Sequence, residues 1–126
     1  MLSREDVLQA QRFDDSVARF SFFLDIHNPA GSSSELHQRL YIKGGSFFEI
    51  PYQCLVPSVV TNLLVSGRCI SADHQANGTV RVIPACFATG QAAGTPAVLS
   101  IQNNKMPEAI DVKQLQKILR QDGCVS

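Results

Sequence analysis

The sequence lacks an excess of charge of either sign, and it lacks any run of basic residues. Eleven lysines and arginines balance eleven aspartates and glutamates over 126 residues, so the formal net charge is zero. A surface that binds nucleic acid or an anionic bilayer needs a concentration of positive charge. We therefore expect no nucleic-acid partner and no membrane partner. With 44% apolar and 17% charged residues, the chain has the composition of a soluble globular domain.

A long uninterrupted apolar segment and a secretory signal are also missing. The longest stretch without charge, residues 82–104, contains Pro84, Gly90, Gly94 and Pro96 and has a polar end. This composition argues against a membrane-spanning segment. The first residues are charged and lead into no apolar core with a cleavage site, so we expect no export signal in this chain and a cytoplasmic location.

The cysteines lack the spacing of a metal site or of a disulfide framework. Cys54, Cys69, Cys86 and Cys124 form no C-x-x-C pair and have no histidine at zinc-ligand spacing. We therefore expect no bound metal. The first three lie in apolar runs, where a reduced cysteine behaves as a small buried hydrophobic residue. This pattern favours a reducing compartment.

Local patterns near the N-terminus predict a short helix and then a strand. Ser3, with Asp6 three positions later, has the arrangement of a capping box, and the helix is expected to end near Phe13. Apolar residues then alternate with polar ones over residues 19–27, which predicts one half-buried strand.

A turn-rich segment separates this strand from two further predicted strands. Residues 28–34 have the composition of an exposed loop. Strands are expected over residues 40–42 and 47–55, and the short glycine-containing segment 43–46 is suited to joining them as an antiparallel hairpin. Pro51 restricts the second strand to an edge or a bulge at that point.

The second half of the sequence predicts a buried strand, a loop and a helix of small residues. Residues 62–67 form a compact apolar run ended by a glycine, which is typical of an interior parallel strand. Residues 82–101 are rich in alanine and also contain Gly90 and Gly94. Each of these glycines costs about 1 kcal/mol of helix propensity, so a close tertiary contact should compensate for it.

Two prolines affect the predicted small-residue helix, and a capping residue and a glycine mark the start and the end of a final helix. Pro84 suits the first turn of the small-residue helix, whereas Pro96 is expected to kink or shorten it. Asp111 is placed to cap a final helix, and Gly123 is its expected stop.

The loop between the predicted strand and helix is a candidate ligand site. Open α/β sheets bind ligands beyond the carboxyl ends of their strands. The start of the small-residue helix would offer unpaired N–H donors over residues 79–82 and a partial positive charge, which suit an anionic or electron-rich group. An ordinary connection packed for stability is an equal alternative on spacing alone.

Four segments resemble a known protein family in the same order along the chain. They are RFDDSVAR (residues 12–19), DIHNP (25–29), IPYQCLVP (50–57) and NLLVSGRCISADHQANGTVRVIPACFATGQAAGTPA (62–97). Together they resemble the C-terminal region of FAD-dependent oxidoreductases of the glutathione-reductase-like type. The GRCIS and GQAAG blocks are the most specific, and the resemblance extends over nearly the whole chain.

The resemblance implies an α/β fold. It also implies that this chain corresponds only to the C-terminal part of such a flavoprotein. Residues 1–57 would be part of a mainly antiparallel substrate domain, with a helix and strands. Residues 58–126 would supply the last strand, loop and helix of a Rossmann-like FAD-binding domain, together with a terminal helix. The implied cofactor is FAD, and the implied substrate is a small molecule.

The resemblance also implies roles for individual residues around the loop. Cofactor-binding positions carried over from the family motif are Gly67, Arg68, Ile70, Ser71, Gly78, Thr79, Val80 and Val82. The candidate catalytic residues are His74 and Arg81. His74 would exchange a proton near the flavin, or it is a surface histidine. Arg81 would place a cation near the flavin, bind a substrate carboxylate, or fix the helix start through a salt bridge.

Several features depart from the family pattern. Gln53 replaces a common arginine, Pro96 replaces an alanine, and Asp73 and Gln75 change the polarity around His74. The glycines form no G-x-G-x-x-G, so the chain alone is not expected to hold the FAD pyrophosphate or to be active.

The missing motif leaves two functional hypotheses. The first is the C-terminal part of a two-electron FAD oxidoreductase, completed by a missing N-terminal portion or a partner chain, with self-association as a further outcome of its uncovered apolar face. The second is a non-catalytic remnant or interaction module. Some relatives work beside iron–sulfur clusters, but the cysteine spacing does not resemble a 4Fe-4S site.

Overall fold

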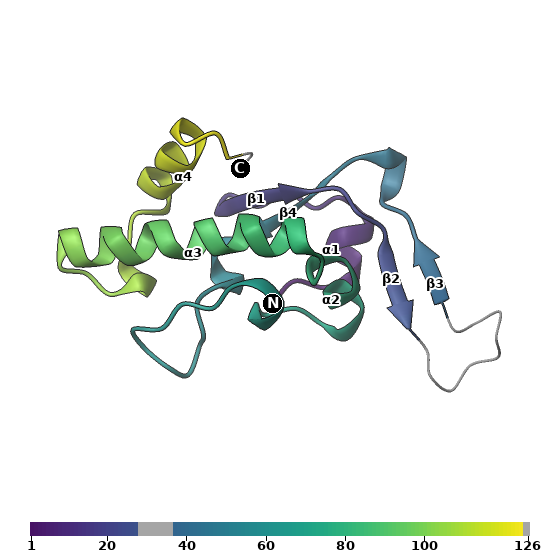
Figure 1. Cartoon of the computed structure of the whole chain (residues 1–126), viewed down its shortest axis with the longest axis horizontal. Coiled ribbons are helices and arrows are strands. Elements are labelled where there is room, and N and C mark those ends of the chain that lie inside the picture. Colours follow the sequence, from purple (N-terminus) through teal and green to yellow (C-terminus); the bar gives the residue numbers. More distant parts are fainter. Residues whose placement is uncertain (28–36, 125–126) are drawn as a thin grey trace.

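The computed structural model describes residues 1–27 and 37–124 as a mixed α/β structure (Figure 1). The predicted loop at residues 28–34 lies outside this part. The helices are α1 (Arg4–Leu8), α2 (His74–Val80), α3 (Ile83–Asn103) and α4 (Val112–Gln121), and the strands are β1 (Ser16–Phe20), β2 (Leu24–His27), β3 (His37–Leu40) and β4 (Phe48–Pro51). The mixed helix and strand composition predicted from the sequence is confirmed.

The strands form two small antiparallel sheets, which corrects two predictions. The single strand expected over residues 19–27 is divided, because β1 pairs with β4 whereas β2 pairs with β3. The hairpin expected around residues 43–46 does not form. Gly44 and Gly45 instead adopt positive φ angles of 66° and 64° in a 3-10 turn, which leads the chain from one sheet to the other.

The buried strand predicted over residues 62–67 is not observed. A strand persists only where a neighbour accepts and donates its backbone hydrogen bonds. Within the described residues, the backbone of 62–65 makes one such bond, from Val65 N–H to Leu55 O at 2.9 Å. Leu63 is 43% exposed rather than buried.

The helix predictions from local signals are largely confirmed. Ser3 and Asp6 form the expected capping box, although α1 ends at Leu8 rather than near Phe13. At the C-terminus, Asp111 caps α4 by accepting from two backbone N–H groups.

The long helix α3 is also confirmed, with one correction. Pro84 occupies its first turn, as expected. Pro96 is buried inside the helix but does not shorten it, because α3 continues to Asn103.

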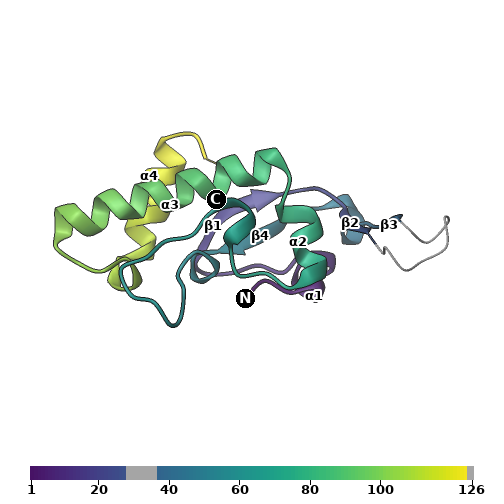
Figure 2. The ribbon, with the colours of Figure 1, turned by 60° about the horizontal axis from the view of Figure 1, so that its bottom comes forward.

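One hydrophobic core joins the two halves of the chain. The helices α3 and α4 pack over β1, and α1 and α2 lie beside β4 and β2 (Figure 2). Core residues from both halves include Leu2, Val7, Val17, Phe48, Ile50, Leu55, Val80, Ala92, Leu115 and Leu119. The division at residue 57 stays a prediction.

The cysteines are free thiols in different environments. Cys54 is buried, and burial raises the pKa of its thiol. Cys86 is half-buried and Cys69 is exposed, so the expectation of burial is wrong for Cys69.

Among the described residues, no single helix, α3 included, is both long enough and apolar enough to cross a membrane. The pair α2 and α3, bent by 93°, satisfies these conditions when its two helices are taken together.

Candidate functional site

The predicted ligand loop is largely folded as helix α2. Asp73 caps this helix by accepting a hydrogen bond from the Ala76 N–H at 2.7 Å. Its second carboxylate oxygen accepts from the Arg4 N–H at 2.7 Å, which ties α2 to the N-terminal segment. The chain then bends by 93° into α3.

This helix changes which backbone groups are available at the site. Thr79 and Val80 lie inside α2, so the expectation that they offer unpaired N–H donors is wrong: helical residues use these groups within the helix. No side chain caps the start of α3. Because Pro84 has no N–H, the first-turn donors are those of Ile83 and Ala85.

The start of α3 opens into a hollow of about 750 Å³, the candidate site. Its lining residues come from the segment before β2, the turn after residue 66, and both helices: Phe22, Arg68, Asn77, Arg81, Val82, Ile83 and Pro84. Three residues predicted from the sequence, Arg68, Arg81 and Val82, are therefore brought together. None of the described residues of this lining carries a carboxylate.

Arg81 is held in the hollow by the strand β2. Its Nη2 lies 3.6 Å from Asp25 Oδ2 and donates to the Asp25 backbone oxygen at 3.3 Å. The salt bridge that was one alternative for Arg81 is thus observed, with Asp25 as the partner. This pair is partly exposed, so its main effect is to orient the guanidinium rather than to stabilise the fold.

Arg68 is anchored by a different kind of contact. Its Nε donates to the Arg81 backbone oxygen at 3.3 Å. The preceding residue, Gly67, has a φ of 61° and donates its N–H to Thr89 Oγ1 at 2.9 Å. Thr89 is fully buried on α3, so this bond fixes the turn that carries Arg68.

Gly78 and Thr79 attach α2 to the strand beside the hollow. A Cβ added at Gly78 would lie 2.7 Å from the Asp25 backbone oxygen, and Thr79 Oγ1 donates to Phe22 O at 2.9 Å. Val80 and Ile70 are buried in the core. These four predicted cofactor-binding residues contact the interior of this chain, which leaves their predicted role without geometric support.

His74 and Ser71 lie apart from the residues around Arg81. His74 is exposed at the first position of α2 and does not line the hollow. The Ser71 N–H donates to Cys54 O at 2.8 Å, and Ser71 lines a different hollow.

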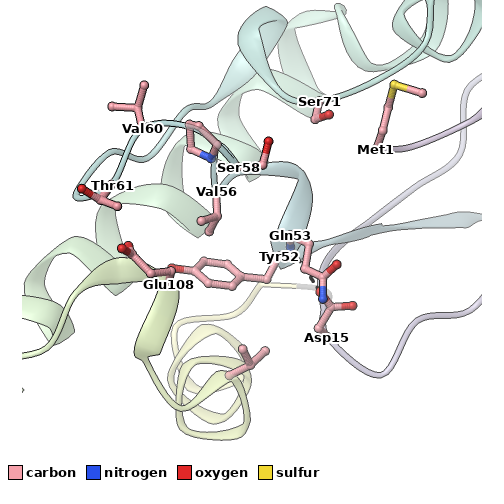
Figure 3. Close-up of a pocket in the computed structure, with 12 residues that line it drawn as sticks. Met1, Asp15, Tyr52, Gln53, Val56, Ser58, Val60, Thr61, Ser71 and Glu108 are labelled. Carbon is pink, nitrogen blue, oxygen red and sulfur yellow. Dashed lines mark hydrogen bonds between the residues drawn. The ribbon is translucent and has the colours of Figure 1, made fainter.

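This second hollow has a volume of about 660 Å³, and Tyr52 is one of the residues that line it (Figure 3). The Tyr52 hydroxyl donates to Pro107 O at 2.8 Å. Burial, and to a lesser extent the Glu108 carboxylate, raises the pKa of Tyr52 to about 12. At the opposite end of the Tyr52 ring, the Gln53 N–H donates to Asp15 Oδ2 at 3.2 Å. Tyr52 is therefore a structural hydrogen-bond donor at neutral pH.

Sequence reasoning missed two residues that line the first hollow, Phe22 and Asn77, and also Asp25, which binds Arg81 without lining the hollow. Phe22 was expected within a continuous strand, and Asp25 was placed on its polar face without a partner. Asn77 lay in the quoted motif but had no assigned role. The proximity of Phe22 and Asp25 to Arg81 depends on contacts between segments more than 50 positions apart, as the Asp25–Arg81 separation of 56 shows, and no local pattern encodes such contacts.

Comparisons with known proteins identify the family of this sequence. The family model described as "FAD dependent oxidoreductase" matches residues 1–119. Comparisons with curated proteins and with solved structures give no significant match. Because the family model spans nearly the whole sequence, the chain belongs to the FAD dependent oxidoreductase family.

Proposed function

We propose that this chain forms one wall of the flavin site in a two-electron FAD-dependent oxidoreductase, with the hollow at the start of α3 facing the flavin ring. The observation that carries the proposal is the convergence of two guanidinium groups and the start of a 21-residue helix on this hollow. Family membership supports the cofactor, and the two cations and the helix dipole support its orientation.

The lining of the hollow is compatible with a flavin ring. Its volume of about 750 Å³ is in the range of small-molecule sites. Phe22, Val82 and Pro84 provide apolar walls, while Arg68 and Asn77 provide hydrogen-bond donors. The chain contains no G-x-G-x-x-G, so we propose that the pyrophosphate cradle comes from polypeptide outside these 126 residues, on the same chain or on a partner.

The residues of this chain would act through electrostatics and positioning. FAD supplies the hydride chemistry when bound. The first turn of α3 and the two guanidinium groups would stabilise negative charge at the adjacent edge of the ring. Phe22 and Val82 would keep water from that edge. Arg81, oriented by Asp25, would hold its charge in a fixed place.

An interaction module is the second candidate, and one observation favours it. Large apolar side chains are exposed along one side of α3, namely Ile83 (65%), Phe87 (75%), Val98 (53%) and Ile101 (82%). Such a surface is typical of a contact with another protein layer. A flavoprotein completed by further polypeptide would also cover this surface.

Flavin binding separates the two candidates. Purified chain is mixed with FAD, alone and with any polypeptide encoded directly upstream, and bound flavin is measured by its visible absorbance and by its bleaching with a reductant. We expect bound flavin with the upstream polypeptide and less of it with Arg68→Gln. The control Lys117→Gln removes an exposed cation on α4, away from the hollow, and should bind normally. Absence of bound flavin in both mixtures would favour the interaction module.

A further inference from the structure

The arginines of this chain differ in how their charge is compensated. Arg4 Nη1 lies 3.0 Å from Glu5 Oε1, and Arg19 Nε lies 3.1 Å from Oε1 of the buried Glu49. Arg12 and Arg39 instead lie over the rings of Phe47 and Phe23, at 3.7 and 5.0 Å from the ring centroids. Each of these four guanidinium groups therefore has a carboxylate or an aromatic partner.

Arg68 has neither kind of partner among residues 1–27 and 37–124. Its one hydrogen bond there runs from Nε to the Arg81 backbone oxygen at 3.3 Å. The Arg68 side chain is exposed, and with Nε engaged in this bond both Nη atoms stay available as a pair of donors. This is the arrangement that binds a carboxylate or a phosphate through two parallel hydrogen bonds.

The neighbouring groups increase the preference for an anion. Arg81 is compensated by Asp25, whose Oδ2 lies 3.6 Å from Arg81 Nη2, so among the described lining residues the charge of Arg68 is in excess. Asn77 adds a neutral amide to the lining. The positive end of α3 lies at the same place, and it favours negative charge within about one turn of the helix start.

We propose that this hollow binds a ligand that carries a carboxylate or a phosphate, and that Arg68 receives this anionic group while Arg81 positions Arg68. Phe22, Val82 and Pro84 would contact an apolar, flat part of the same ligand. The inference deepens the proposed function, because the anion belongs either to an acidic substrate or to the flavin itself. Anion binding by Arg68 can nevertheless be measured without flavin.

The test uses the chain labelled with ¹⁵N at low ionic strength. Four probes are titrated separately, namely benzoate, inorganic phosphate, riboflavin and its phosphate FMN, and the Nε–H signals of Arg68 and Arg81 are followed. We expect an anionic probe to shift the Arg68 signal and Arg68→Gln to weaken its binding about tenfold, as loss of a charge-assisted contact implies. Arg68→Lys should restore part of the affinity, because it keeps the charge but not the paired donors. Lys117→Gln is the matched control.

The probes distinguish the two sources of the anion. Phosphate binding that depends on Arg68 supports the proposal for either source of the anion. Benzoate binding that depends on Arg68 supports an acidic substrate, even if no flavin binds, in which case the proposed function fails alone. Tighter binding of FMN than of riboflavin, with no effect of benzoate, assigns the anion to the flavin phosphate, and the proposed orientation with the flavin ring in this hollow then fails. The proposal is overturned if no anionic probe shifts Arg68, or if Lys117→Gln weakens binding as much as Arg68→Gln.

Discussion

Gly78 packs directly against the backbone of Asp25. A Cβ at position 78 would lie 2.7 Å from the Asp25 carbonyl oxygen and 3.4 Å from its nitrogen. The same Asp25 binds Arg81 through its backbone oxygen and its carboxylate. The contact of α2 with β2 therefore sets the position of a guanidinium group in the candidate site.

Gly78→Ala should destabilise the chain despite the better helix propensity of alanine. The methyl group would overlap a backbone atom that cannot rotate away, so we expect a loss of about 1–3 kcal/mol in the free energy of unfolding. Urea unfolding followed by circular dichroism measures this loss. An unchanged midpoint would show that α2 and β2 separate without cost.

Gly90→Ala and Gly94→Ala should have the opposite effect. Both glycines lie within α3, and an added Cβ would meet no described atom within 4 Å at either position, so the close tertiary contact predicted for them is not observed there. Each substitution should therefore increase stability by up to about 1 kcal/mol through helix propensity alone. The same unfolding experiment provides the measurement, and these variants serve as matched controls for position 78. A loss of stability would mean that the surface of α3 around Gly90 and Gly94 is covered in solution.

Thr89→Val should weaken the turn that carries Arg68. The Thr89 hydroxyl accepts from the Gly67 N–H at 2.9 Å and donates to Ala85 O at 2.8 Å. Valine has nearly the same shape but leaves the Gly67 N–H unpaired, at a cost of about 1–3 kcal/mol. Hydrogen exchange at Gly67 should accelerate. Thr95→Val, on the same helix, is the control and should leave the Gly67 amide unaffected.

Tyr52 should ionise only in strongly alkaline solution. Burial and the Glu108 carboxylate raise its pKa from 10.0 to about 12, because both disfavour the phenolate in the folded state. The resulting stabilisation is fully present below pH 10 and is lost as the pH rises through about 12. An ultraviolet titration of phenolate absorbance checks this.

Tyr52→Phe tests the same interaction by removal. The variant should lose the late ionisation and leave Pro107 O without its 2.8 Å donor, at a cost of about 1 kcal/mol at neutral pH. Glu108→Gln should shift the late ionisation to lower pH without abolishing it. A titration curve that is identical in the parent chain and in Tyr52→Phe would contradict the assignment.

The sequence by itself determined the features that depend on near neighbours in the chain. The capping box of Ser3 and Asp6, the cap at Asp111 and the helix α3 are encoded within a few positions, because helix hydrogen bonds and caps join residues three to four apart. The resemblance to the family likewise predicts a ligand site around Arg68 and Arg81.

Only the tertiary structure decided which segments meet. Strand pairing depends on a partner elsewhere in the chain, so β2 pairs with β3 rather than continuing β1, and residues 62–67 form no strand. For the same reason, no local sequence pattern predicts the contact between Asp25 and Arg81, which are 56 positions apart. The sequence therefore identified Arg68 and Arg81 as candidates, whereas long-range packing decided that Arg81 has a carboxylate partner and that Arg68 has none among the described residues.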